Sequence, residues 1–120
     1  MTFEEFQDTI ELAYEQIPKQ FRDILEEKNI AIIALEKTPE PMAERHRGLN
    51  ILGAFIGTHY GDFVLANLST DPTRIELYKE GFDKSFKNDD DIKAQIGKTL
   101  VHEIAHFLGF KEEEIRALDY

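Results

Sequence analysis

Residues 102–106 read His-Glu-Ile-Ala-His, and these residue types point more directly to chemistry than any other segment. The stretch from Asp90 to Leu108 has no proline and repeats apolar residues at helical spacing, which predicts one long helix. His102 and His106 then lie one turn apart on the same face, where two imidazoles can bind one metal ion. Glu103, on the same side of the helix, can take a proton from a water molecule at that ion. This pattern is typical of zinc-dependent hydrolysis of peptide bonds.

Both histidines could instead be ordinary residues at the edge of a buried helix. The arrangement of the apolar residues favours the metal-site hypothesis, because they form one arc that can build a core while the histidines and Glu103 lie on roughly the opposite side. The apolar arc consists of Ile96, Leu100, Ile104, Phe107 and Leu108.

A third metal ligand is expected just after this helix. Gly109 follows the second histidine by three residues, where a left-handed residue would end the helix, with Phe110 folding back onto the last turn. The chain would then reverse and return Glu112 to the ion, which completes a catalytic site with three protein ligands. Alternatively, Glu112 only stabilises, by its negative charge, the first turn of a closing helix over residues 111–118. The reserve candidates for the third ligand are His59, Glu113 and Asp119.

Residues 102–112, His-Glu-Ile-Ala-His-Phe-Leu-Gly-Phe-Lys-Glu, resemble the H-E-x-x-H-x-x-G-x-x-[D/E] signature of the short zincin-like metallopeptidases, the minimal zincin group of small bacterial proteins. The order of the predicted elements is similar over nearly the whole chain. The resemblance implies an α+β zincin-like fold, with several helices on a small mixed sheet and a long C-terminal metal-binding helix. The larger metzincin proteases differ, because they have histidine at the position of Glu112 and a methionine-containing turn after it, whereas the methionines here are Met1 and Met42.

Length and composition predict a single soluble domain over residues 1–120. The absence of cysteine excludes disulfides, thiolate zinc sites and cysteine nucleophiles, and agrees with a cytoplasmic protein. No apolar run reaches the length of about 18 residues that a membrane-spanning helix needs, and no secretion signal is evident, so we expect no membrane partner. A net charge of −10 argues against a nucleic-acid partner, because binding to phosphates depends on Lys and Arg.

Two amphipathic helices are expected at the start of the chain. Thr2 and Glu5 form a capping-box pattern, and the helical periodicity after them predicts a first helix from Phe3 to Gln16. Pro18 fits the first turn of a second helix that ends near Asn29.

The middle of the chain predicts a small sheet. Residues 30–35 are continuously apolar and are expected to form the central strand. Residues 36–48 include two prolines and are expected to form a surface loop. The segment beginning at residue 49 suggests a strand, a turn and a second strand. Residues 74–79 alternate polar and apolar side chains. The zincin resemblance makes this last segment the candidate edge strand that would bind an extended substrate, although an ordinary charged sheet edge has the same pattern.

Four further polar residues lie near the expected site. Gln95 and Thr99 share the helical side of the histidines and either line a cleft or, as we favour, form an exposed polar stripe. Tyr60 and Tyr78 could donate a hydrogen bond to an oxyanion, but neither is assigned that role.

The sequence therefore predicts a zinc-dependent metallopeptidase that acts on a peptide or protein substrate. His102, His106 and Glu112 would bind Zn²⁺, and Glu103 would act as the general base and then as the proton donor. One alternative is a metal-stabilised binding module without catalysis. The other is a zinc-dependent endoribonuclease of the ribosomal-RNA maturation type, whose motif usually lacks the glutamate and ends in a third histidine; Glu103, Glu112 and the acidic surface argue against it.

Overall fold

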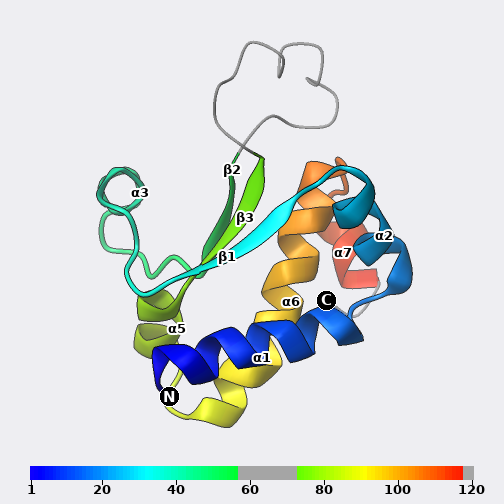
Figure 1. Cartoon of the computed structure of the whole chain (residues 1–120). Helices are drawn as coiled ribbons and strands as arrows, with labels where there is room; N and C mark the ends of the chain where they lie inside the picture. Colours follow the sequence, from blue (N-terminus) through cyan, green and yellow to red (C-terminus); the bar gives the residue numbers. More distant parts are fainter. Residues whose placement is uncertain (57–72, 118–120) are drawn as a thin grey trace.

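The computed structural model describes residues 1–56 and 73–117, apart from the side chain of Glu112. Helices pack against a small mixed sheet, which confirms the predicted α+β class (Figure 1). In chain order the elements are α1 (Phe3–Gln16), α2 (Lys19–Glu27), β1 (Ala31–Leu35), α3 (Glu40–Arg45), β2 (Gly53–Ile56), β3 (Arg74–Tyr78), α5 (Lys79–Ser85), α6 (Asp89–Phe107) and α7 (Glu112–Ala117).

The strand order differs from the one expected from the sequence. The described strands are ordered β1-β3-β2, with β1 parallel and β2 antiparallel to β3. Within this described sheet the apolar strand β1 lies at an edge, which contradicts the prediction that it is central. Strand β3, predicted to be an edge strand, is the central one.

The polar residues of β3 are compatible with a central position because they bond to one another. The Nε atom of Arg74 donates to Oε2 of Glu76 at 2.8 Å, and the Tyr78 hydroxyl donates to Oε1 of Glu76 at 2.9 Å. The Glu76 carboxylate, in a residue only 6% exposed, thus has two donors, which offset much of the free-energy cost of burying it. Burial, followed by the bond to Glu76, raises the pKa of Tyr78 above its ordinary value, so the hydroxyl remains a donor.

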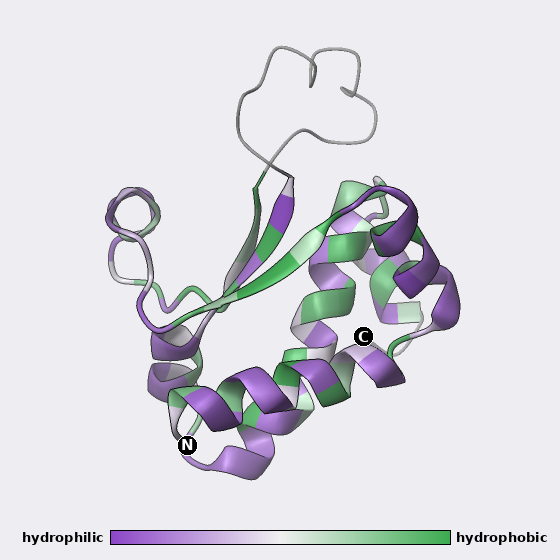
Figure 2. Ribbon diagram, viewed as in Figure 1, coloured by the Kyte–Doolittle hydropathy of each residue, from purple (hydrophilic) through white to green (hydrophobic). Residues whose placement is uncertain are grey.

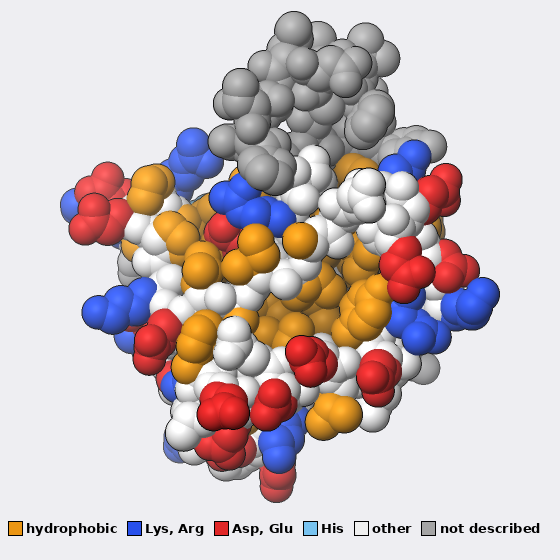
Figure 3. Space-filling model, in the orientation of Figure 1, with side chains coloured by type: hydrophobic (Ala, Val, Ile, Leu, Met, Phe, Trp, Pro, Cys, Tyr) orange, Lys and Arg blue, Asp and Glu red, His pale blue; other side chains and the backbone are white. Residues whose placement is uncertain are grey.

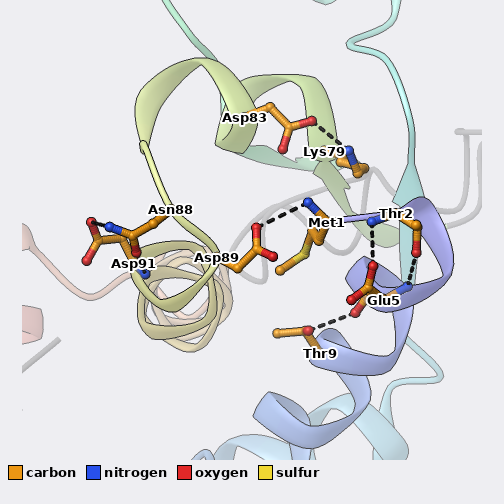
Figure 4. Close-up of polar contacts among 9 residues, drawn as sticks. All are labelled: Met1, Thr2, Glu5, Thr9, Lys79, Asp83, Asn88, Asp89 and Asp91. Atoms are coloured by element: carbon orange, nitrogen blue, oxygen red, sulfur yellow. Dashed lines mark hydrogen bonds and ion pairs between the residues drawn. The ribbon is translucent and has the colours of Figure 1, made fainter.

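Helix α1 begins and ends where the sequence predicts, and its start is fixed by local hydrogen bonds (Figure 4). The hydroxyl of Thr2 accepts from the backbone N–H of Glu5 at 3.1 Å, and the Glu5 carboxylate accepts from the N–H of Thr2 at 2.9 Å. The bond from the Thr2 N–H is the main cause that lowers the pKa of the Glu5 carboxyl. The terminal ammonium of Met1 lies 3.1 Å from Oδ1 of Asp89, which joins the beginning of α1 to the beginning of α6.

The hydrophobic core lies between the sheet and the inward faces of α1, α2 and α6 (Figure 2). The apolar arc predicted for the long helix is part of it, and only Leu108 is half-buried rather than buried. Within the described residues, no helix combines the length and apolarity needed to cross a membrane. The largest fully buried side chains of this core are Phe6, Phe21, Phe82, Ile75, Leu77, Ile96, Leu100 and Ile104.

The segment predicted as a surface loop over residues 36–48 contains the short helix α3. Its prolines start the helix rather than prevent it: Pro39 is the N-cap and Pro41 lies in the first turn, where the missing N–H costs nothing. None of its residues is buried, so the segment is at the surface as expected. In the middle of the chain, the first expected strand is β2, whereas the turn and second strand fall outside the described residues.

Candidate metal centre

Helix α6 ends as the sequence predicts, in a left-handed glycine. Gly109 has φ of +85°, its N–H donates to the carbonyl of His106 at 3.0 Å, and the N–H of Phe110 donates to the carbonyl of Ala105 at 2.9 Å. This pair of bonds is the Schellman motif, which reverses the chain directly after the second histidine. The Phe110 ring packs edge-on against Phe21 of α2, with ring centroids 6.5 Å apart.

The two histidines lie on the half-buried side of α6. The ring centroids of His102 and His106 are 6.2 Å apart, and their planes are inclined by 74°. Glu103 is also half-buried, whereas Ile104 and Ala105 between them are fully buried. The helix thus has the two faces that the sequence predicts, one in the core and one that carries the polar groups.

These polar groups line a groove of about 440 Å³ between α6 and the segment that begins β2. Gln95 and Thr99 are half-buried there, so the prediction that they form a merely exposed stripe is wrong. The Thr99 hydroxyl donates to the carbonyl of Gln95 at 2.8 Å, which leaves its oxygen available to accept. The described lining consists of Leu52, Gly53, Gln95, Lys98, Thr99, His102, Glu103 and His106.

The second wall of the groove depends on close packing of β2 against β3 and α6. A Cβ atom on Gly53 would lie 2.6 Å from the backbone oxygen of Glu76 and 2.8 Å from Cδ2 of Leu77, which is too close for any larger residue without movement. Two residues later, Phe55 stacks on Phe107 with ring centroids 4.6 Å apart. Sequence reasoning missed this wall, although a glycine within an apolar strand often marks a close backbone approach.

Replacing Gly53 with alanine should therefore destabilise the fold by about 1–3 kcal/mol, because the added methyl group forces β2 away from β3. Gly97→Ala is the matched control: a Cβ atom there meets only Cβ of Ala13, at 4.0 Å. In the middle of α6 this change should stabilise the protein by roughly 0.5–1 kcal/mol. Urea unfolding of both variants measures the difference. Equal effects would show that the packing at Gly53 is not tight.

The described side chains do not supply a third metal ligand beside the two histidines. Within that set, no group of three His, Asp or Glu side chains could hold a metal ion, so the exposed Glu113 does not join the two histidines. The backbone of Glu112 begins α7, directly after the chain reversal, but its side chain, His59 and Asp119 lie outside the described set. Two imidazoles on one wall of a groove, 6.2 Å apart, are suited to zinc, which accepts nitrogen ligands at about 2.0–2.1 Å.

The geometry assigns Tyr78 to the sheet rather than to the groove. Its side chain is fully buried, and its hydroxyl proton is directed to Glu76, so it is not placed to donate to a reacting carbonyl. Tyr60 lies outside the described residues.

Comparison with known proteins agrees with this arrangement. The sequence profile of the family described as zincin-like metallopeptidase matches residues 27–120. A conserved hypothetical protein from Thermus thermophilus has a similar structure, with a TM-score of 0.61 and 22% identity over 90% of this chain and 94% of that chain. That likeness shows the shared fold, and the search of curated proteins finds no match. With the profile covering most of the chain, including α6 and its two histidines, this protein belongs to the zincin-like metallopeptidase family.

Proposed function

We propose that this chain, as a single domain, is a zinc-dependent peptidase. The observation that carries the proposal is that His102, Glu103 and His106 line one groove beside the sheet, on a helix whose opposite face is fixed in the core. Membership of the metallopeptidase family supports the same chemistry and counts against the endoribonuclease alternative.

His102, His106 and Glu112 are the residues that would hold the ion. Zinc bound there would polarise the scissile carbonyl and lower the pKa of a water molecule. Glu103 lines the groove next to His102, which supports its role as the group that would accept a proton from water and pass it to the leaving amine. The packed core beneath α6 fixes the helix that carries His102, Glu103 and His106, which favours catalysis because the backbone that positions these groups does not need to rearrange.

The substrate would lie extended along β2. Among the described strands β2 pairs with β3 alone, and the groove is lined by its first residue, Gly53, and by Leu52 directly before it. An extended peptide can add to such an edge through backbone hydrogen bonds. Strand β2 thus takes the role that the sequence suggested for residues 74–79, since β3 is paired on both sides.

Incubation of the zinc-loaded protein with a mixed peptide library tests this function. We expect internal peptide bonds to be cut, with cleavage sites identified by mass spectrometry. A folded, zinc-loaded protein that cuts no peptide would instead support the metal-stabilised binding module.

The role of Glu112 is tested by alanine substitution at three neighbouring carboxylates. Glu112→Ala should weaken zinc affinity by about 100-fold or more, since even the loss of a hydrogen-bond partner behind a ligand costs about 10–100-fold. Glu113→Ala and Glu114→Ala should leave the affinity nearly unchanged, because Glu113 is exposed and Glu114 accepts a hydrogen bond from the backbone of Lys111. Competition with a fluorescent chelator measures the zinc affinity of all three variants. Equal losses would reduce Glu112 to a favourable charge at the start of α7.

A further inference from the structure

Among the described strands, the edge of the sheet opposite β2 is formed by β1, whose sequence has none of the residues that usually protect such an edge. Among the described strands β1 pairs only with β3, so alternate backbone groups along its other edge point away from the sheet. Proteins usually protect such an edge with lysine, proline or a bulge, but β1 reads Ala-Ile-Ile-Ala-Leu. Ile33, in its centre, is 37% exposed.

Two adjoining hollows lie between this edge and the helices α1 and α2. Their volumes are about 450 and 290 Å³, and Tyr14 and Ile30 line both. Figure 3 shows an apolar floor in this region, between α1 and β1, with carboxylates of α1 along one side. The apolar lining residues are Ile10, Tyr14, Leu25, Ile30, Ala31 and Ile32.

The described charged residues that line the hollows are all acidic. Glu11, Glu15 and Glu26 line them, and the described lining of neither hollow includes a Lys or Arg. Glu26 also accepts a hydrogen bond from the Tyr14 hydroxyl at 3.3 Å. Arg22 lines neither hollow, although its charge acts on the Tyr14 hydroxyl and lowers the pKa of that group, against the larger raising effects of burial and of Glu26.

We propose that β1 and these hollows bind an extended segment of a partner protein, with apolar side chains at every second position and Lys or Arg beside them. The partner backbone would add a strand to β1, its apolar side chains would enter the hollows, and its basic side chains would meet the acidic rim. This surface lies at the other edge of the sheet from the catalytic groove, and the inference does not rest on the proposed peptidase activity.

A second copy of the chain is a poorer occupant than a basic segment. Pairing two β1 strands would bring two sets of the carboxylates of Glu11, Glu15 and Glu26 to one interface, in a protein whose net charge is −10. Like charges in such an interface repel and disfavour association.

The five residues of β1 match an extended partner of about 17 Å, since each residue adds about 3.3–3.4 Å.

Binding of a synthetic peptide to the full-length protein tests the proposal. The probe is a labelled, end-blocked peptide of sequence Lys-Val-Thr-Val-Thr-Val-Lys, and the control replaces both threonines with proline, which keeps the charge but cannot form the backbone pairing. Fluorescence anisotropy should show at least tenfold tighter binding of the first peptide. Hydrogen exchange should slow in residues 31–35 when it binds. Equal affinities, or slowing in β2 instead of β1, would overturn the proposal.

Reversing the charge of the acidic residues that line the hollows provides a second test of the proposal. The double variant Glu11→Lys and Glu15→Lys should weaken binding of the peptide at least tenfold and should fold normally, because both positions are exposed on α1. Glu40→Lys with Glu44→Lys makes the same charge change at the same spacing on α3, away from the hollows, and should bind as the unaltered protein does. The same loss in both variants would mean nonspecific attraction to an acidic protein. A dimer in light scattering that already protects β1 without peptide would identify a second copy as the occupant.

Discussion

Glu103→Gln should lower the rate of peptide hydrolysis by about 1,000-fold, within the range of roughly 10²–10⁴ that a positioned general base contributes. The substitution keeps the size and shape of the side chain, so the groove and both histidines should stay in place. It removes the carboxylate that accepts the proton, which no other described carboxylate lining the groove can replace. Initial rates on a peptide cleaved in the library, together with the zinc content of the purified variant, measure the effect.

The zinc content separates the base from a ligand. It should stay near one ion per chain in Glu103→Gln, whereas loss of the metal would make Glu103 a ligand and contradict the proposed mechanism. Glu44→Gln is a suitable control, because Glu44 is an exposed carboxylate of α3 that does not line the groove. Its rate should equal that of the unaltered protein.

The helices that build the core could be predicted because their signals are local. The capping pair of Thr2 and Glu5 and the apolar spacing after it predict α1 to the residue. Gly109 likewise marks the end of α6, where the structure shows both hydrogen bonds expected of a left-handed glycine. In each case the residues that decide the boundary lie within a few positions of it.

The strand order could not be predicted, because it depends on contacts between distant segments. A continuous apolar run usually indicates a strand buried on both faces, but Ile33 of β1 is exposed, and among the described strands β1 pairs on one side only. The alternating pattern of β3 suggested an exposed face, yet Glu76 is buried there with Arg74 and Tyr78 as donors. The sequence pattern is the same whether polar side chains are buried and bond to one another or are exposed to water.

The same difference between local and long-range signals applies to the candidate site. His102, Glu103 and His106 could be found from their spacing on one helix, and they do line one groove. The wall opposite, at Leu52 and Gly53, comes from a segment some 50 residues earlier, and no local pattern links the two. The position of the Glu112 side chain remains a prediction.

Removal of zinc should lower the melting temperature, and restoring it should raise it again. A ligand that binds only the folded state stabilises it by about 4 kcal/mol when its free concentration is roughly 1,000 times the dissociation constant. For a chain of 120 residues this corresponds to a shift on the order of 10–20 °C. Calorimetry or thermal fluorescence on chelator-treated and zinc-restored protein measures it. A purified protein without zinc that gains no stability from the ion would exclude the site.

The response to zinc should depend on His102 and not on His46. Because His102 lies in the groove 6.2 Å, ring to ring, from His106, His102→Ala should leave a single imidazole there and abolish most of the zinc-induced shift. His46 is exposed after α3 and lines a separate hollow of about 210 Å³, so His46→Ala should respond to zinc as the unaltered protein does. Each variant is compared with its own zinc-free form, so any change in intrinsic stability cancels. A loss of the shift in His46→Ala, with retention in His102→Ala, would place the ion at the other end of the molecule.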